Sequence, residues 1–278
     1  MVIEQALLEA TRAMQAEGIP SPRLEANVLL GHILSLDRAG LLRAQTSELS
    51  EADLSAFRAL TKRRIGGEPT AYLIGSREFM SLDFSVSAAV LIPRPDTEIL
   101  VEADIEAAKA YQAPHILDLC CGSGCIGVSL AHYLPKAQVT LMDLSFEAVE
   151  VSKTNAARHA PENTSVLQGD AFNLSGTYDM IVSNPPYIET AVVDGLQTEV
   201  RDHEPRLALD GGTDGLRFYT HFAKTMQCNL KPGGLLALEV GHTQARVVSA
   251  LLEENGWRDI RICTDLADIE RVVLAYKK

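Results

Sequence analysis

The stretch His115-Ile116-Leu117-Asp118-Leu119-Cys120-Cys121-Gly122-Ser123-Gly124 decides the fold of this chain. Its first part is apolar apart from one acid and predicts a short strand over Ile116–Leu119. Glycines then allow a tight turn and let a ligand approach the backbone, and the helix that follows offers unpaired N–H groups in its first turn. The stretch therefore predicts a strand, a ligand-binding turn and a helix.

The same alternation of strand and helix continues to the end of the chain. We expect strands over Ile116–Leu119, Gln138–Met142, Ser165–Gln168, Met180–Ser183, Leu235–Val240, Ile260–Cys263 and Arg271–Ala275. We expect helices over Glu98–Tyr111, with Asp96 or Thr97 as the cap, and over Gly124–Leu134, Phe146–His159, Leu216–Asn229 and Thr243–Asn255. This order predicts an α/β fold with a mainly parallel sheet, helices on both faces, and a ligand beyond the carboxyl ends of the strands.

The first part of the chain has a different character. Apolar residues recur at helical spacing in three sets: Leu7, Leu8 and Met14; Leu24, Val28, Leu29 and Ile33; and Leu54, Phe57, Leu60 and Ile65. Ser50 is expected to cap the helix that carries the third set. After them, Tyr72-Leu73-Ile74, Glu78-Phe79-Met80 and Leu82–Val86 favour a β-hairpin. We therefore divide the chain into a small helical bundle (1–71), a hairpin connector (72–95) and an α/β domain (96–278).

Composition and charge limit the class of protein. Of the 278 residues, 46% are hydrophobic and 22% are charged, which is ordinary globular composition. No apolar run approaches the ~18 residues of a membrane helix, Glu4 stands where a signal peptide would carry a base, and five cysteines form no disulfide pattern. The net charge is −12, of which residues 76–278 carry −11, so the chain would repel a phosphate backbone. We expect a cytoplasmic protein, a monomer, that binds neither membrane nor nucleic acid.

The glycine turn is compatible with two cofactors. Gly122, Gly124 and Gly127 form a dinucleotide pattern, and Asp143 lies 21 residues after Gly122, where an acid would accept hydrogen bonds from ribose hydroxyls. Alternatively, Asp118-x-Cys120-x-Gly122-x-Gly124 resembles the S-adenosylmethionine loop of class I methyltransferases, with Cys120 in place of a glycine. A third reading of Asp143 makes it only the cap of the next helix. The sequence up to this point predicts a nucleotide-type cofactor without deciding which.

Three cysteines near this turn are not expected to bind metal. Cys120 and Cys121 are adjacent, so their side chains point to opposite faces if the strand continues, and Cys125 follows. No His or Cys follows at ligand spacing. We interpret the three as small apolar residues that fill a tight turn.

The tetrapeptide Asn184-Pro185-Pro186-Tyr187 at the end of the fourth predicted strand favours the methyltransferase reading. It resembles the (Asp/Asn)-Pro-Pro-aromatic motif of enzymes that methylate planar amino nitrogens. The Asn184 side-chain oxygen and the Pro185 carbonyl can each accept one N–H from the target nitrogen and favour the positive charge that develops on it. Tyr187 can stack on a flat target.

A more specific resemblance covers nearly the whole chain. Segments similar to the HemK-type glutamine N5-methyltransferases are 68–75, Phe79, 91–98, 183–188, 204–212 and 238–244. The resemblance implies a class I methyltransferase fold and methyl transfer from S-adenosylmethionine to the glutamine of the Gly-Gly-Gln motif in class I peptide-chain release factors. It also implies that the N-terminal bundle helps to dock this protein substrate during modification of the translation-termination machinery.

The same resemblance assigns the site residues. Those implied for the methyl donor are Cys120, Cys121, Gly122, Ser123, Gly124, Asp143, Ala171 and Asn184, and those implied for the glutamine are Asn184, Pro185, Pro186 and Tyr187. Family members often carry Trp where Ala171 stands, so Phe172 is a second candidate for contact with adenine.

Rival functions remain open at this point. A glutamine methyltransferase acting on a ribosomal protein would share Asn184–Tyr187. A nucleic-acid amino-methyltransferase would also share it, but it should carry a basic groove, for which this acidic chain offers no candidate. A nicotinamide oxidoreductase would need hydride-transfer residues that we cannot place, and a silent binding module would have little reason to keep the tetrapeptide.

Overall fold

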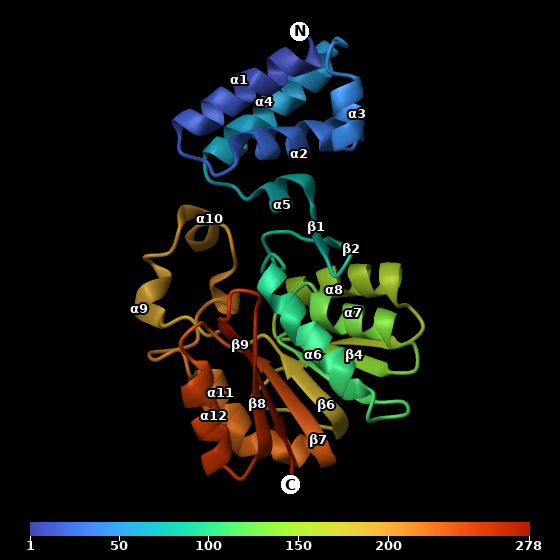
Figure 1. Ribbon diagram of the computed structural model, residues 1–278, viewed down its shortest axis with the longest axis vertical. Coiled ribbons are helices and arrows are strands. Elements are labelled where there is room, and N and C mark those ends of the chain that lie inside the picture. The colour runs from blue at the N-terminus through green and yellow to red at the C-terminus, as the bar shows by residue number, and fades with distance from the viewer. The chain divides into compact units, whose positions relative to one another are not determined.

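The computed structural model describes residues 1–278, and its largest element is a seven-stranded sheet (Figure 1). The strand order is β5-β4-β3-β6-β7-β9-β8. The five strands from β5 to β7 run parallel, whereas β9 runs antiparallel to both β7 and β8. Their bounds are His115–Leu119 (β3), Gln138–Asp143 (β4), Thr164–Gln168 (β5), Tyr178–Ser183 (β6), Leu230–Glu239 (β7), Arg258–Thr264 (β8) and Glu270–Tyr276 (β9).

Helices cover both faces of this sheet, as predicted. Side chains of the central strands alternate between two apolar cores: Ile116 joins one core, and Leu117 and Leu119 join the other. The first core includes residues of α6 (Glu98–Ala108), α7 (Cys125–Tyr133) and α8 (Phe146–His159). The second includes residues of α11 (Arg217–Thr225), η3 (Met226–Asn229) and α12 (Ala245–Glu254). Burial on both faces explains why the central strands are almost wholly apolar.

The N-terminal helices form a core of their own. They are α1 (Ile3–Ala16), α2 (Pro22–Leu34), α3 (Arg38–Arg43), α4 (Glu51–Ile65) and α5 (Thr70–Ile74). Leu7, Met14, Leu29 and Phe57 are buried in this core, and Ser50 caps α4 by accepting from the Asp53 N–H at 3.1 Å. These predictions are confirmed.

The prediction is wrong for two residues of this bundle that we expected on its buried faces. Leu8 and Leu24 are 41% and 55% exposed. Leu8 directly follows Leu7, so the 100° step of the helix turns it away from the buried stripe. Leu24 lies in the first turn of α2, and the buried residues of this helix are Ala26, Leu29, Leu30 and Gly31.

The hairpin prediction is right for one part and wrong for the other. Strands β1 (Ser76–Phe79) and β2 (Leu82–Ser85) form a two-stranded sheet. Tyr72-Leu73-Ile74, however, belongs to helix α5, which starts after Pro69 and ends at Gly75 in the left-handed conformation. Leu73 is buried in the N-terminal core, so tertiary burial decides its conformation against its β propensity.

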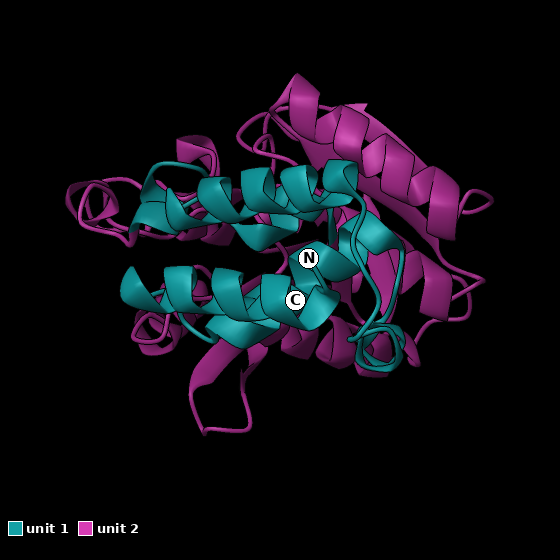
Figure 2. Ribbon diagram, turned by 90° about the horizontal axis from the view of Figure 1, so that it is seen from above, with its two compact units in different colours: residues 1–76, 198–203 teal, residues 77–197, 204–278 magenta.

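The chain forms two compact units, and their boundary is not a single point in the sequence (Figure 2). Unit 1 comprises Met1–Ser76 together with Thr198–His203, and unit 2 comprises Arg77–Gln197 and Glu204–Lys278. The segment Thr198–His203 includes the short helix α10 (Thr198–Arg201). It lies between β6 and α11 in sequence, where α9 (Thr190–Val193) and η2 (Arg206–Ala208) also lie.

A buried cation holds this segment within unit 1. Arg64, 3% exposed, pairs with Glu25 at 3.0 Å and with Glu199 at 2.6 Å. A division of the chain into continuous segments separates Arg64 from Glu199, because Glu199 lies 135 residues after Arg64. None of the helices combines the length and the apolar character that crossing a membrane requires.

Candidate active site

The glycine turn connects β3 to α7 through three residues in the left-handed conformation. Cys120, Gly122 and Gly124 have φ of 62°, 54° and 78°. A Cβ built on Gly124 would lie 2.7 Å from the Leu141 side chain, so only glycine fits there. Cys120 adopts the positive φ that a glycine would take more easily. The turn therefore follows the predicted course despite the cysteine.

Asp118, near the end of β3, stabilises this turn. Its Oδ2 accepts the Gly127 N–H at 2.8 Å, and a Cβ on Gly127 would lie 2.9 Å from the Asp118 side chain. Asp118 is fully buried, and this burial raises its pKa to about 7, although the Gly127 N–H opposes the rise. Its contact with α7 fixes the helix start against the strand end.

Asp143 joins the turn to the end of β4. Its Oδ2 accepts the Gly122 N–H at 2.8 Å and its Oδ1 accepts the Ser145 N–H at 2.9 Å. The cap of α8 is Ser145, which accepts from the Ala148 N–H at 3.1 Å, so the alternative reading of Asp143 as that cap is wrong. Burial raises the pKa of Asp143, and its N–H donors lower it. Each oxygen keeps a lone pair for a further donor.

The cysteines of the turn are free and mostly buried. Cys121 and Cys125 are 5% and 8% exposed, and Cys120 is half-buried. Burial raises the pKa of the Cys125 thiol to about 12 and raises those of Cys120 and Cys121 as well. The three thiols are therefore neutral and act as small packing groups, since only a thiolate is reactive.

The tetrapeptide Asn184–Tyr187 begins where β6 ends. Asn184 is half-buried, and its Nδ2 donates to Thr97 Oγ1 at 3.4 Å. The Tyr187 ring packs against the second core, and its backbone carbonyl accepts from Gln244 Nε2 at 3.0 Å. Burial raises the pKa of Tyr187 to about 12, so its hydroxyl stays protonated. These two contacts of Tyr187 fix the end of the tetrapeptide that is opposite to Asn184.

Thr97, one of the two predicted caps, occupies the N-cap position of α6, but its side chain makes no capping hydrogen bond. It is the last residue of the 3₁₀ turn η1 (Pro95–Thr97) and has a helical backbone conformation. Asp96 instead pairs with Arg271 at 2.7 Å. Thr97 is 2% exposed and faces Asn184.

A cavity of about 680 Å³ in unit 2 brings most of these residues together. Among the predicted site residues, those that line it are Cys120, Cys121, Gly122, Ser123, Asp143, Ala171, Asn184 and Pro186. Gly124, Pro185 and Tyr187 are not among the lining residues: Gly124 shapes the turn, Pro185 is buried, and Tyr187 packs behind it. The glycine turn and the tetrapeptide thus border one space.

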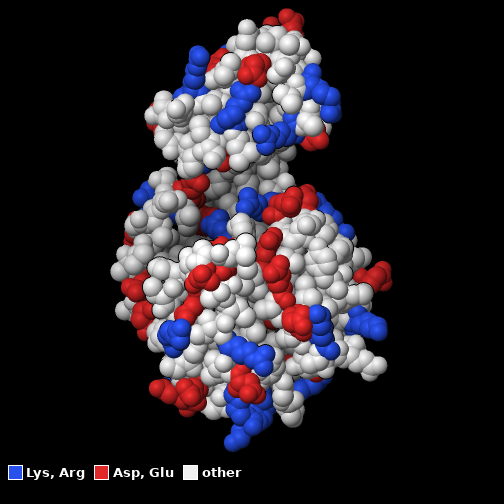
Figure 3. All heavy atoms as spheres, viewed as in Figure 1, with Lys and Arg blue, Asp and Glu red and all other residues white.

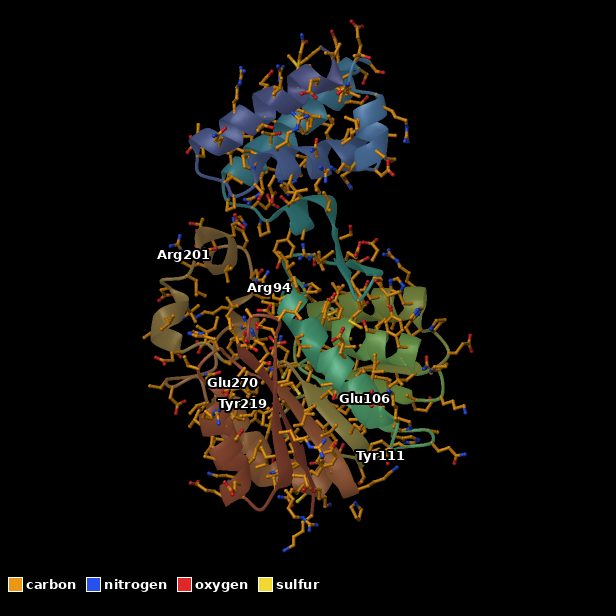
Figure 4. All side chains as sticks on the ribbon, in the orientation of Figure 1. Arg94, Glu106, Tyr111, Arg201, Tyr219 and Glu270 are labelled. Carbon is orange, nitrogen blue, oxygen red and sulfur yellow. The ribbon has the colours of Figure 1, made fainter.

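The cavity has further lining residues: Arg94, which lies in the family-like segment 91–98, and Arg217 and Phe218, which sequence reasoning missed. Arg94, labelled in Figure 4, precedes α6 and makes a 2.7 Å ion pair with Glu204, whose side chain is 1% exposed. Arg217 and Phe218 come from the start of α11, and the Arg217 guanidinium lies 4.9 Å from the centroid of the Phe172 ring. Their distance in sequence from the turn left no spacing signal to find them. Phe172, noted as a second candidate beside Ala171, lines the cavity too.

Two sequence families match this chain. Residues 5–75 match the family described as PrmC N-terminal domain, and residues 95–211 match the one described as Methyltransferase small domain. Among solved structures, a methyltransferase from Pyrococcus furiosus has a TM-score of 0.52 at 17% identity, covering 78% of this chain and 96% of its own. The hMettl16 catalytic domain in complex with a 3′UTR hairpin has a TM-score of 0.58 at 16% identity, covering 78% of this chain and 81% of its own. These structures confirm the predicted class I methyltransferase fold.

Curated relatives are far more similar in sequence. A release factor glutamine methyltransferase of Moorella thermoacetica is 46% identical over 282 residues, covering 100% of this chain and 99% of the relative. One of Geobacter sulfurreducens is 43% identical over 270 residues, covering 96% of this chain and 94% of the relative. On this full-length similarity, the chain belongs to the release factor glutamine methyltransferase family.

Proposed function

We propose that this protein transfers a methyl group from S-adenosylmethionine to the side-chain amide nitrogen of the glutamine in the Gly-Gly-Gln motif of class I peptide-chain release factors. The observation that carries the proposal is the position of Asn184, which lines the same cavity as Gly122 and Asp143. A donor-binding turn and an amide-binding motif thus share one space. The full-length similarity to release factor glutamine methyltransferases supports the choice of substrate.

The cavity suits a nucleoside-type donor. Its volume of about 680 Å³ lies within the usual range for small-molecule sites. The Asp143 carboxylate, held by two backbone N–H groups, has lone pairs left for ribose hydroxyls, and Phe172 offers an aromatic face for a base. S-adenosylmethionine, when bound, supplies an activated methyl group on a sulfonium sulfur.

Asn184 and Pro185 are the proposed partners of the glutamine amide. The amide nitrogen is a poor nucleophile because its lone pair is delocalised into the carbonyl group. The Asn184 side-chain oxygen and the Pro185 carbonyl would each accept one of its N–H groups and favour the positive charge that develops there. Pro185 and Pro186 hold that carbonyl rigidly, since proline fixes the backbone φ. Tyr187 stays a predicted stacking partner for the flat amide.

Orientation supplies the main catalytic effect in this scheme. Holding the two reactants in line contributes ~7–11 kcal/mol to lowering a barrier of this kind. The amide proton becomes acidic once the methyl group has transferred, so the scheme needs no strong base. In this scheme the residues of the site accept hydrogen bonds from the substrate amide and enclose the two reactants.

Charge and domain layout support a protein substrate. Acidic and basic side chains are interspersed over the face of unit 2 that Figure 3 shows. Residues 76–278 carry a net charge of −11, which suits a basic protein loop better than a nucleic-acid strand. We propose residues 1–71 as the substrate-docking domain, 72–95 as the connector and 96–278 as the methyltransferase domain of a monomer.

Mass spectrometry of a purified release factor tests this function. The factor is incubated with the protein and S-adenosylmethionine and then digested, and its peptides are mapped. We expect one added methyl group on the Gly-Gly-Gln glutamine, and none with an Asn184→Ala variant that still binds the donor. An unmodified release factor together with a methylated ribosomal protein would move the proposal to the other protein substrate.

A further inference from the structure

Three polar side chains meet where β6, β7 and α6 come together. Ser183 of β6 pairs with Leu238 of β7, so the next residues along these parallel strands, Asn184 and Glu239, lie side by side at the same sheet edge. Thr97 approaches them from the start of α6. Glu239 and Thr97 are only 3% and 2% exposed, so both polar groups need partners within the protein.

A hydrogen bond joins two of these side chains, and the third, Glu239, lies beside Asn184 in the strand register. Asn184 Nδ2 donates to Thr97 Oγ1 at 3.4 Å. Burial raises the pKa of the Glu239 carboxyl group to about 7, and hydrogen bonding to Thr97 and Asn184 opposes that rise. Its second oxygen, Oε2, is buried without any partner. Thr97 is free for this contact because it makes no capping bond in α6.

The chemistry of these groups selects one orientation of the Asn184 amide. A threonine hydroxyl has one hydrogen to donate and two lone pairs that accept. If the Thr97 hydroxyl donates to the Glu239 carboxylate, only its lone pairs are left to face Asn184. The NH₂ end of the amide is then attracted to both neighbours, whereas the oxygen end would be repelled by them. Oδ1 is consequently directed away from Thr97.

We propose that Thr97 and Glu239 are positioning residues that orient the Asn184 amide so that its oxygen faces the substrate nitrogen. This inference rests on the proposed function, because it assigns a purpose to that orientation. Neither residue has a part in the scheme above. Their effect is to keep the acceptor in place before the substrate arrives, which reduces the reorganisation needed in the transition state.

The surroundings of Glu239 give this carboxyl group no cation of its own. Arg271 interacts with it electrostatically, but the ion pairs of Arg271 are with Asp96 at 2.7 Å and with Asp265 at 2.9 Å. The Tyr219 hydroxyl, labelled in Figure 4, donates to the backbone carbonyl of Glu239 at 2.8 Å and leaves the side chain free. The titratable and charged groups that interact with Glu239 are Asp96, Cys125, Tyr187, Tyr219 and Arg271. Hydrogen bonding with Thr97 and Asn184 is accordingly what lowers the pKa of this carboxyl group besides the charge of Arg271.

A pair of Thr97 variants separates positioning from packing. Thr97→Val keeps the shape of the side chain and removes the hydroxyl, whereas Thr97→Ser keeps the hydroxyl. We expect kcat to fall about tenfold in the valine variant and to recover in the serine variant, with the Kd for S-adenosylmethionine unchanged in both. Thr140→Val on β4, outside the cavity, is the matched control and should behave as the native protein. Equal kcat in the valine variant and the native protein would overturn the proposal.

The pH dependence of a Glu239→Gln variant gives a second readout that packing alone would not move. The carboxylate accepts better than the carboxylic acid, so kcat of the native protein should rise with pH through about 7. The kcat of the variant should not rise with pH in this way. It should equal that of the native protein below about pH 6 and be about tenfold lower than the native value above about pH 8. Glu254→Gln on α12 should keep the native profile. If kcat of Glu239→Gln still rose with pH as in the native protein, the role of the carboxylate would be contradicted.

An Asn184→Ala variant distinguishes failure of this inference from failure of the proposed function. If that variant is inactive while Thr97→Val and Glu239→Gln match the native protein, only the positioning role is wrong. If Asn184→Ala keeps native activity, the role of Asn184 is wrong and the positioning role falls with it.

Discussion

At the scale of single residues, Cys120 takes a backbone conformation that favours glycine. Its φ is 62°, in the left-handed region, where a side chain costs about 1–2 kcal/mol. A Cys120→Gly variant loses that cost together with the thiol, whereas Cys120→Ala loses only the thiol. We therefore expect the glycine variant to have the larger free energy of unfolding, by about 1 kcal/mol, in denaturant titrations.

The matched control for this comparison is Ser249 in the interior of α12. At this helical position the order of stability should be the opposite: Ser249→Ala should have a larger free energy of unfolding than Ser249→Gly, by about 1 kcal/mol. If alanine were the more stable substitution at both positions, strain at Cys120 would not account for the turn.

Buried carboxyl groups predict how stability depends on pH. Asp104 is fully buried, neither of its oxygens has a partner, and burial raises its pKa well above the usual value, with Asp118 adding to the rise. A carboxyl pKa that is higher in the folded state contributes stability below the unfolded-state pKa, and this contribution is lost as the pH rises through the folded-state pKa. Asp118 and Glu239, each with a pKa of about 7, act in the same direction.

An Asp104→Asn variant tests this dependence, because its side chain stays neutral at every pH. We expect its unfolding free energy to match that of the native protein near pH 3, below the usual Asp pKa, and to exceed it by about 1–3 kcal/mol near pH 8. An exposed acid replaced in the same way, Glu254→Gln, should show no such divergence. A constant difference between the Asp104 variant and the native protein across this range would show that Asp104 does not titrate as described.

At the scale of elements, the strands and helices of residues 96–278 were predictable almost throughout. All seven predicted strands and the predicted helices between them are found where apolar periodicity places them, because the central strands contribute to two cores and each of these helices to one. The short helices α9 and α10 were not predicted. Prediction failed where tertiary contacts override local signals. Leu73 is helical because it reaches the N-terminal core, and the side chain of Thr97, at the N-cap position of α6, bonds to Asn184 and not to the helix backbone.

The candidate site divides in the same way. Gly122, Asp143 and Asn184 were predictable because glycine turns and strand-end polar residues carry a local signature. Arg217 and Phe218 were not, since they reach the cavity from the start of α11 with no fixed spacing to the motifs. The left-handed φ of Cys120 could not be read from a residue type that disfavours it.

The segment Thr198–His203 provides a prediction at the element scale. Its anchor in unit 1 is the 2.6 Å ion pair between Glu199 and the buried Arg64. In Glu199→Ala, the amide hydrogens of this segment should exchange about tenfold faster, because a charge-assisted hydrogen bond to a buried partner is lost. Exchange in β3 and β6 should not change.

Glu48→Ala, in the loop before α4, is the control for that experiment, since Glu48 makes no ion pair. Native exchange rates at Thr198–His203 in the Glu199 variant would mean that the ion pair does not hold the segment.

At the scale of the whole molecule, unit 1 and unit 2 have separate apolar cores, and the cavity is lined by residues of unit 2 alone. A donor bound there should stabilise unit 2. At a concentration of S-adenosylmethionine about a hundred times its Kd, the unfolding free energy of unit 2 should rise by about 2.7 kcal/mol. Asn184→Ala should show the same rise and Asp143→Ala a much smaller one, which thermal unfolding followed by calorimetry can measure.

The most direct test of the central claim compares two quantities in one Asn184→Ala preparation. These are the single-turnover rate of methyl transfer to a release factor and the Kd for S-adenosylmethionine. The account predicts that the rate falls by about a thousandfold or more, while the Kd stays within about threefold of the native value. A variant that binds the donor normally and transfers the methyl group at the native rate would contradict the account.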